Sequence, residues 1–209
     1  PVITGTPTED QTLTADTTSI ADADGLGTFA YQWQRSTDGG TTWSNIGANA
    51  STYLLGDVDV GHVIRVTVSY TDAQGTAEPL TSAQTAAIAN VNDVPTGAPV
   101  VTGTPTEDQT LTADTSSIAD ADGLGTFAYQ WQRSTDGGTT WSNVGANATT
   151  YLLGDADVGA VIRISFSYTD GQSTAESLTS AQTAPIANVN DVPTGVAAIT
   201  GTTTEDQIL

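Results

Sequence analysis

The 209-residue sequence contains no cysteine, one histidine and only four basic residues, all of them arginine. Without cysteine the chain can form neither disulfide bonds nor thiolate metal sites, which excludes a small domain held together by disulfides. The 24 acidic residues leave a formal net charge of −20. Nucleic acids and anionic membranes are bound by clusters of lysine and arginine, so we expect neither as a partner.

The sequence also lacks long hydrophobic runs. No apolar stretch approaches the roughly 18 residues of a membrane-spanning helix. No basic segment followed by an apolar one marks a signal peptide. We therefore expect no insertion into a membrane. The abrupt start and end suggest a piece of a longer chain.

One unit of 98 residues recurs along the chain, and this repetition predicts its organisation. TGTPTEDQTLTADT begins at Thr4 and again at Thr102, and the related TGTTTEDQIL begins at Thr200. The two full copies differ at 14 of 98 aligned positions. The predicted domains are a first repeat at 1–95, a second at 96–193 and the start of a third at 194–209.

Each repeat is predicted to be all-β. Apolar and polar residues alternate in FAYQWQ (29–34) and VIRVTVSY (63–70), which is the pattern of half-buried strands. Further strands are expected near 1–5, 11–16, 43–47, 52–55 and 77–89. About seven strands per repeat, with a tryptophan on the third, predict tandem immunoglobulin-like (cadherin-like) β-sandwich domains arranged end to end. Packing around Trp33 and Trp131 must replace the usual disulfide between the sheets.

The segment STDGGTTW occurs at 36–43 and 134–141 and resembles the Asp-box of sialidases and related sugar-cleaving propellers. Asp38, Gly39 and Gly40 are residues that tolerate the positive φ of a tight hairpin, so a structural turn is predicted. Those enzymes also need an arginine cluster, a catalytic Tyr/Glu pair and several propeller blades. Each repeat has two arginines on predicted strands, and His62 becomes Ala160 in the second copy. We therefore expect no enzyme, no catalytic residues and no small-molecule substrate.

Acidic and amide residues gather at the predicted ends of strands, in TEDQ, DADG, GDVDVG, SYTD and NVNDVP. In the first repeat these residues are Glu9, Asp22, Asp24, Asp57, Asp59, Asp72, Asn90, Asn92 and Asp93. Their counterparts in the second are Glu107, Asp120, Asp122, Asp155, Asp157, Asp170, Asn188, Asn190 and Asp191. All are candidate metal ligands.

In a sandwich of this topology, the DADG and SYTD loops lie at one end and the other three segments at the opposite end. Stacking two repeats would make Glu9, Asp57, Asp59, Asn90, Asn92 and Asp93 face Asp120, Asp122 and Asp170. So many carboxylates repel one another unless a cation lies among them, and oxygen ligands without histidine or cysteine select Ca²⁺. Roughly one to three ions would fit each junction. The alternative is plain solubility, because Asp and Asn are common in turns.

These motifs resemble the interdomain calcium site of cadherins, in which an early acidic residue, an acidic loop, an Asn/Asp-rich linker and an Asp-x-Asp share calcium. The whole chain resembles the tandem Ig-like extender repeats of giant RTX-type bacterial adhesins, with NVNDVPTG, DADGLGT, YQWQ and SYTD. The resemblance implies an extracellular location on the bacterial cell surface and a structural role in adhesion or biofilm formation. Its partners would be neighbouring repeats of one long, monomeric chain.

A second hypothesis is a carbohydrate-binding module, because calcium and exposed aromatic residues are common in lectins. It predicts that Trp43 and Trp141 lie on a flat, solvent-facing patch. Packing of these side chains over the hairpin would count against it.

Overall fold

The structure is a computed structural model that describes residues 1–201 and 204–205. The chain divides into two compact units. Unit 1 comprises Pro1–Thr96, Ala119–Thr126 and Tyr168–Glu176, and unit 2 comprises Gly97–Ile118, Phe127–Ser167 and the described residues from Ser177 onward. The predicted third repeat falls partly on residues 202–203 and 206–209, which lie outside the described residues, and its described part contains no strand.

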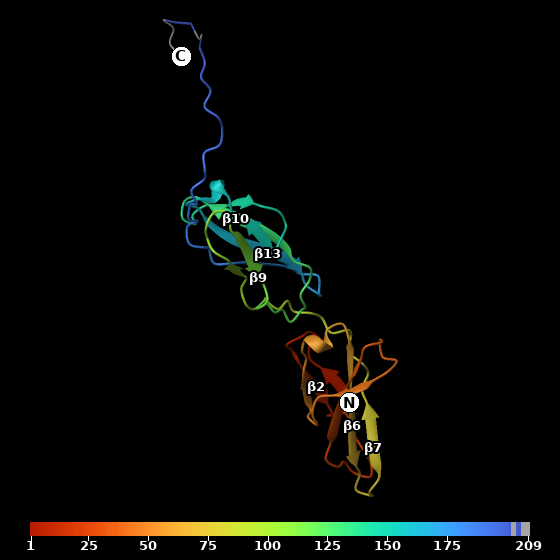
Figure 1. Cartoon of the computed structure of the whole chain (residues 1–209). Helices are drawn as coiled ribbons and strands as arrows, with labels where there is room; N and C mark the ends of the chain where they lie inside the picture. The colour runs from red at the N-terminus through yellow and green to blue at the C-terminus, as the bar shows by residue number, and fades with distance from the viewer. Residues whose placement is uncertain (202–203, 206–209) are drawn as a thin grey trace. The chain divides into compact units, whose positions relative to one another are not determined.

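The first repeat forms two antiparallel sheets (Figure 1). One has the order β1-β2-β5, and the other has the order β4-β3-β6-β7. Their bounds are β1 Val2–Thr4, β2 Thr12–Asp16, β5 Thr52–Leu54, β4 Ser44–Ile46, β3 Ala30–Ser36, β6 Val63–Thr71 and β7 Ala77–Thr81. A single 3-10 turn, η1, spans Asp57–Asp59 before β6.

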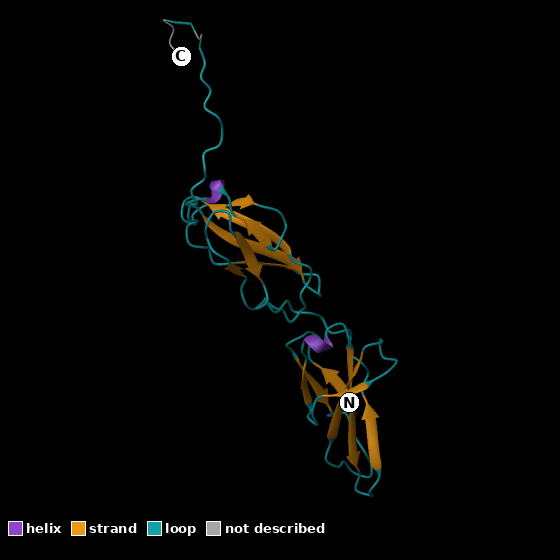
Figure 2. Ribbon diagram, in the orientation of Figure 1, coloured by secondary structure: helices purple, strands orange, loops and turns teal. Residues whose placement is uncertain are grey.

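The second repeat has the same topology, with orders β8-β9-β12 and β11-β10-β13-β14 (Figure 2). Its strands are β8 Val100–Thr102, β9 Thr110–Asp114, β12 Thr150–Leu152, β11 Ser142–Val144, β10 Ala128–Ser134, β13 Val161–Thr169 and β14 Ala175–Thr179, and η2 spans Asp155–Asp157. The prediction of tandem all-β sandwiches with about seven strands each is confirmed. In the first repeat, the three-stranded and the four-stranded sheet share one hydrophobic core.

The core of each sandwich follows from the alternation along its central strands. Trp33 lies opposite Val66 in the register of β3 and β6, and both side chains are fully buried. Arg65 and Thr67, on the other face of β6, stay half-buried. The indole N–H of Trp33 donates to the carbonyl of Ala50 at 2.9 Å, so the largest core side chain has no unsatisfied polar atom.

The strand expected at 77–89 ends at Thr81. Beyond it, the hydroxyls of Ser82 and Thr85 accept hydrogen bonds from the backbone N–H groups of Val66 and Ile64, taking the place of backbone carbonyls. The backbone N–H groups of Ser82 and Thr85 still donate to the carbonyls of Val66 and Ile64, and Ile88 forms a parallel bridge with Val60. Side-chain hydroxyls that replace ladder bonds therefore interrupt the predicted strand.

The STDGGTTW hairpin is stabilised by its own side chains. Both carboxylate oxygens of Asp38 accept hydrogen bonds, from the backbone of Thr41 and Thr42 and from the hydroxyls of Ser36 and Thr42. Gly39 and Gly40 have φ of +73° and +102°, a region that favours glycine. These bonds, led by the one from the Thr42 backbone, hold the pKa of Asp38 well below its usual range. The predicted structural turn is confirmed.

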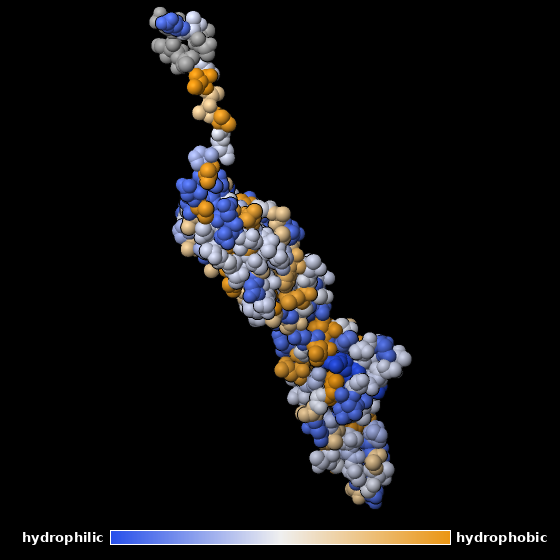
Figure 3. Space-filling view, in the orientation of Figure 1, coloured by the Kyte–Doolittle hydropathy of each residue, from blue (hydrophilic) through white to orange (hydrophobic). Residues whose placement is uncertain are grey.

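On the face drawn in Figure 3, strongly hydrophobic residues appear as separate patches among more polar ones. The exposed large apolar residues include Val94, Val192 and Leu54. In the part of the chain that the structure describes, no helix has the length and apolar character needed to cross a membrane.

Candidate metal centre

Glu9 is a carboxylate that the fold buries in the connection between β1 and β2. The backbone N–H of Glu9 donates to the carbonyl of Ala89 at 2.9 Å, and the backbone N–H of Val91 donates to Oε2 of Glu9 at 3.2 Å. Only 1% of Glu9 is exposed. The local conformation is unusual, because the next residue, Asp10, has φ of +60°. The backbone thus holds a buried acid at the end of the sandwich.

Three carboxylates of unit 1 come together there. Glu9, Asp93 and Asp122 each offer an oxygen, and these oxygens lie within 4.8 Å of one another. The backbone N–H of Asp93 donates to Oδ2 of Asp122 at 2.8 Å. Asp122 is only 6% exposed. The structure therefore joins one residue from each of the predicted TEDQ, NVNDVP and DADG segments within one compact unit.

Three buried side-chain atoms have no hydrogen-bond partner among the described residues, and all three are oxygens of predicted ligands. They are Oε1 of Glu9, Oδ1 of Asn90 and Oδ2 of Asp170. All three residues belong to unit 1. Buried polar atoms are nearly always paired in folded proteins, and an unpaired one costs about 1–3 kcal/mol. Three acceptor oxygens without donors are therefore suited to contact a cation.

The carboxylates of this group destabilise one another's charged forms. Burial raises the pKa of Glu9 to about 7, and the nearby carboxylate of Asp57 adds to the shift. The pKa of Asp93 is also raised, first by burial and then by the charges of Asp57 and Asp122. Both shifts record unfavourable electrostatics that a bound cation would relieve.

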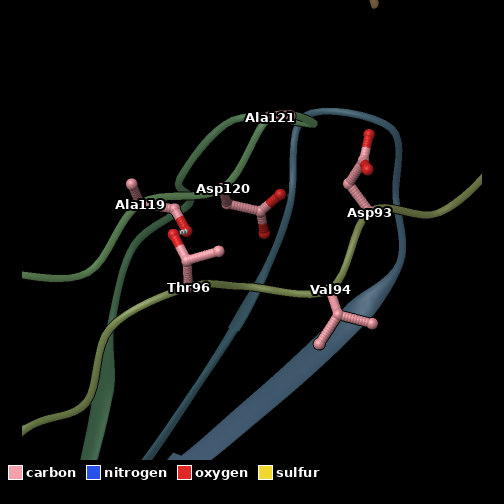
Figure 4. Close-up of a pocket in the computed structure, with 6 residues that line it drawn as sticks. All are labelled: Asp93, Val94, Thr96, Ala119, Asp120 and Ala121. Atoms are coloured by element: carbon pink, nitrogen blue, oxygen red, sulfur yellow. Dashed lines mark hydrogen bonds between the residues drawn. The ribbon is translucent and has the colours of Figure 1, made fainter.

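A hollow of about 340 Å³ adjoins this group (Figure 4). The hydroxyl and backbone N–H of Thr96 both donate to the carbonyl of Ala119, at 3.2 and 2.7 Å. Oδ2 of Asp120 accepts a hydrogen bond from the hydroxyl of Tyr168. Figure 4 shows the Asp120 side chain pointing toward the side on which Asp93 lies. The hollow is lined by Asp93, Val94, Thr96, Ala119, Asp120 and Ala121.

The second repeat carries a related group in unit 2. Oxygens of Glu107, Asp155 and Asp191 lie within 4.8 Å of one another. Glu107 is 2% exposed and accepts a hydrogen bond from the backbone N–H of Val189 at 2.9 Å, as Glu9 does from Val91. Asn188 and Asn190 are exposed.

Asp59 and Asp157 lie elsewhere than the sequence analysis placed them. Oδ1 of Asp59 forms an ion pair of 3.0 Å with Arg35, and Oδ2 accepts from the hydroxyl of Tyr53 at 3.0 Å and from the backbone N–H of Gly56 at 3.2 Å. Arg133 and Tyr151 hold Asp157 in the same way. In the sequence, Arg35 is the residue that could have indicated this ion pair, because each repeat has only two arginines with which an acidic residue can pair.

Asp22, Asp24 and Asp72 of the first repeat are not brought into either group. Asp22 accepts from the hydroxyl of Tyr70 at 2.8 Å and from the backbone N–H of Asp24 at 2.9 Å. Oδ1 of Asp72 accepts from the backbone of Gln74 and Thr76. Asp24 is exposed. Asp22 and Asp72 thus stabilise turns.

Sequence reasoning missed Glu176, which lies in unit 1 with the metal group. Its Oε1 accepts a hydrogen bond from Nδ2 of Asn92 at 3.0 Å, so it positions the predicted linker ligand. Glu176 lies on strand β14, whereas the candidate ligands were predicted at the ends of strands and in acidic loops. Asn92 itself is exposed and is not part of the three-carboxylate group.

Trp43 and Trp141 pack over their hairpins. The indole N–H of Trp43 donates to the carbonyl of Gly40 at 3.0 Å, and the guanidinium of Arg65 lies 4.1 Å from the ring centroid. In the second repeat Trp141 bonds Gly138, and Arg163 lies over its ring at 3.9 Å. A ring with one face covered by a cation is not an open platform for a sugar, which counts against the carbohydrate-binding hypothesis.

Comparisons with known proteins match one family model and a number of solved structures. The sequence model of a family described as a domain of unknown function, DUF8696, matches residues 3–90. Among solved structures, the chicken interferon gamma receptor alpha chain is 8% identical, with 87% of this chain and 93% of that chain covered and a TM-score of 0.32. The FN1–FN3 domains of chicken CNTN1 are 17% identical, with coverages of 94% and 70% and a TM-score of 0.33. No curated protein matches the sequence.

Proposed function

We propose that the chain is a structural extender region of a secreted bacterial cell-surface adhesin, in which Ca²⁺ at interdomain junctions stiffens an array of repeats. In this role the array projects a distal binding domain for adhesion or biofilm formation. Its contacts are with neighbouring repeats of the same chain, and the region has no catalytic residues. The resemblance to extender repeats supports the biological setting, and the carboxylate group supports the calcium.

The observation that carries the calcium proposal is the set of buried oxygens without partners. Glu9, Asn90 and Asp170 come from three segments of the sequence, and each buries an acceptor atom that no described protein group satisfies. A single hydrogen-bond donor would pair with only one of these oxygens, whereas a cation can be coordinated by several oxygens at once. Calcium takes six to eight oxygen ligands and accepts carboxylate, amide and backbone oxygens alike.

The residues that would hold an ion in unit 1 are Glu9, Asp93 and Asp122, and the unpartnered oxygens of Asn90 and Asp170 are further candidate ligands in the same unit. The bound cation would supply the positive charge that these acids lack. Glu9, Asn90 and Asp93 belong to the first sequence repeat, whereas Asp122 and Asp170 belong to the second. Ligands drawn from both repeats would couple calcium binding to the order of the connection between them. Without the ion, repulsion among the carboxylates would loosen it.

Small-angle scattering and thermal unfolding of the 209-residue chain test the proposal. In Ca²⁺ the scattering profile should give a longer and better defined maximum dimension than in a chelator. The melting temperature should rise with calcium concentration, because an ion that binds only the native state stabilises it by mass action. Mg²⁺ at the same ionic strength is the control for screening. Identical profiles and melting temperatures in calcium and chelator would overturn the proposal.

A further inference from the structure

Two asparagines, one in each repeat, lie in acceptor sequences for N-linked sugar. Asn49-Ala50-Ser51 and Asn147-Ala148-Thr149 match the pattern Asn-x-Ser/Thr, and none of the other six asparagines does. The third residue of the pattern is at one of the 14 positions that differ between the repeats: Ser51 in the first repeat corresponds to Thr149 in the second. The substitution therefore keeps the hydroxyl that the acceptor sequence requires.

The structure presents both asparagines at the surface in a fixed turn. Asn49 and Asn147 are exposed and precede strands β5 and β12. The carbonyl of the middle residue is held from below, because the buried Trp33 donates to Ala50 at 2.9 Å and Trp131 donates to Ala148 at 3.0 Å. The acceptor turn is thus anchored to the core of each sandwich.

The side-chain amide of each asparagine is oriented with its nitrogen available. Oδ1 of Asn49 accepts a hydrogen bond from the backbone N–H of Tyr31 at 2.7 Å, and Oδ1 of Asn147 accepts one from Tyr129 at 2.7 Å. Among the described residues no hydrogen bond engages Nδ2 of either side chain. A sugar on Nδ2 leaves Oδ1 unchanged as an acceptor, so the fold retains this bond after modification.

A shallow hollow of about 300 Å³ lies beside Asn147 in unit 2. Asn147 itself lines the hollow, together with Gln130, Ser165 and Ser167. The aromatic residues Tyr129 and Phe166 also border it, but Phe166 is only 1% exposed and its ring belongs to the core. The hollow therefore offers space and polar groups beside Asn147 for an attached sugar.

We propose that Asn49 and Asn147 are N-glycosylation sites of this protein. In the transfer, Nδ2 attacks the anomeric carbon of an activated sugar, a sugar pyrophosphate carried by a lipid or a nucleotide, within a glycosyltransferase. The new C–N bond forms as the C–O bond to the phosphate breaks and its electron pair leaves with the phosphate. One proton of the amide passes to a base of the transferase. This proposal is independent of calcium binding.

Peptide mass spectrometry of the protein purified from its natural source tests the proposal. The chain has no lysine, so trypsin releases 36–65 and 134–163, each with one acceptor asparagine and one ordinary one, Asn45 or Asn143. Added mass of hexose or N-acetylhexosamine is expected, and fragmentation should place it on Asn49 and Asn147. Unmodified peptides, or sugar on Asn45, Asn143 or a hydroxyl, would overturn the proposal.

Variants made in the same host separate the acceptor sequence from mere exposure. Ser51→Ala and Thr149→Ala keep the asparagine and its bond to the tyrosine backbone, and they should abolish the added mass at the adjacent asparagine. Ser51→Thr should retain it. Circular dichroism of each variant checks that the sandwich is folded. Sugar that persists on Asn49 in Ser51→Ala would contradict the inference.

Discussion

Oε2 of Glu9 accepts a hydrogen bond of 3.2 Å from the backbone N–H of Val91, while Oε1 of the same carboxylate is buried and has no partner among the described residues. Glu107 and Val189 form the equivalent bond at 2.9 Å in the second repeat. In the first repeat this hydrogen bond joins the loop between β1 and β2 to the segment that follows β7. One oxygen of the carboxylate is therefore held by the backbone, and an oxygen of the same residue lies within 4.8 Å of oxygens of Asp93 and Asp122.

Asp122→Asn should weaken calcium binding roughly tenfold or more, because it removes a charged ligand from a buried group of three. The matched control is Asp24→Asn. Asp24 is the same residue of the first repeat, but it is exposed and belongs to no carboxylate group of the described chain. Isothermal titration with Ca²⁺ measures both. Equal losses of affinity in the two variants would show that general negative charge, and not this group, binds the ion.

Asp59→Ala should lower the free energy of unfolding by about 3 kcal/mol, because it leaves Arg35 and Tyr53 without their buried partner. Urea denaturation followed by circular dichroism measures the loss. The affinity for calcium should stay within about twofold, since the Asp59 carboxylate is engaged by Arg35, Tyr53 and Gly56 and belongs to neither carboxylate group of the described residues. A variant that is stable but binds calcium poorly would restore the ligand role that the sequence suggested.

The Asp38 hairpin should make the protein sensitive to acid. Hydrogen bonds hold the pKa of Asp38 below its usual value near 3.8, so the unfolded chain takes up a proton before the native chain does. The stability that this residue contributes is present above about pH 4 and declines as the pH falls further. Melting temperatures between pH 2 and pH 6 should therefore depend less on pH in Asp38→Asn than in the natural protein. Asp24→Asn, at an exposed site, should leave the profile unchanged.

Gly27→Ala should destabilise the first sandwich by about 1–3 kcal/mol, because a Cβ at this position would clash with the backbone carbonyl oxygen of Thr71. The control is Gly56→Ala, where a Cβ meets nothing within 4 Å and φ is −140°. That variant should be neutral or stabilised by about 0.5 kcal/mol, since alanine restricts the unfolded chain. Thermal unfolding compares the two. Similar melting temperatures would show that the backbone around Gly27 yields easily.

Much of the fold follows from local patterns in the sequence. The alternation in VIRVTVSY specifies which side chains of β6 are buried, and the structure places Ile64, Val66 and Val68 in the core. The STDGGTTW hairpin is equally local, since all the bonds of Asp38 lie within four residues. The end of β7 at Thr81 was not predictable in this way, because it depends on hydroxyls that bond to a neighbouring strand.

Composition and spacing determined that this protein is a pair of nearly identical acidic sandwiches with carboxylates at the strand ends. Tertiary structure decided what each carboxylate does. Within the three residues of η1, Asp57 lies beside Glu9 and Asp59 pairs with Arg35. In the sequence GDVDVG nothing distinguishes the two aspartates. The physical reason is that sequence specifies charge and local conformation, whereas a carboxylate's role depends on which partners the fold brings to it. At Asp59 the fold supplies a cation and two hydrogen-bond donors, and at Glu9 it supplies more carboxylates.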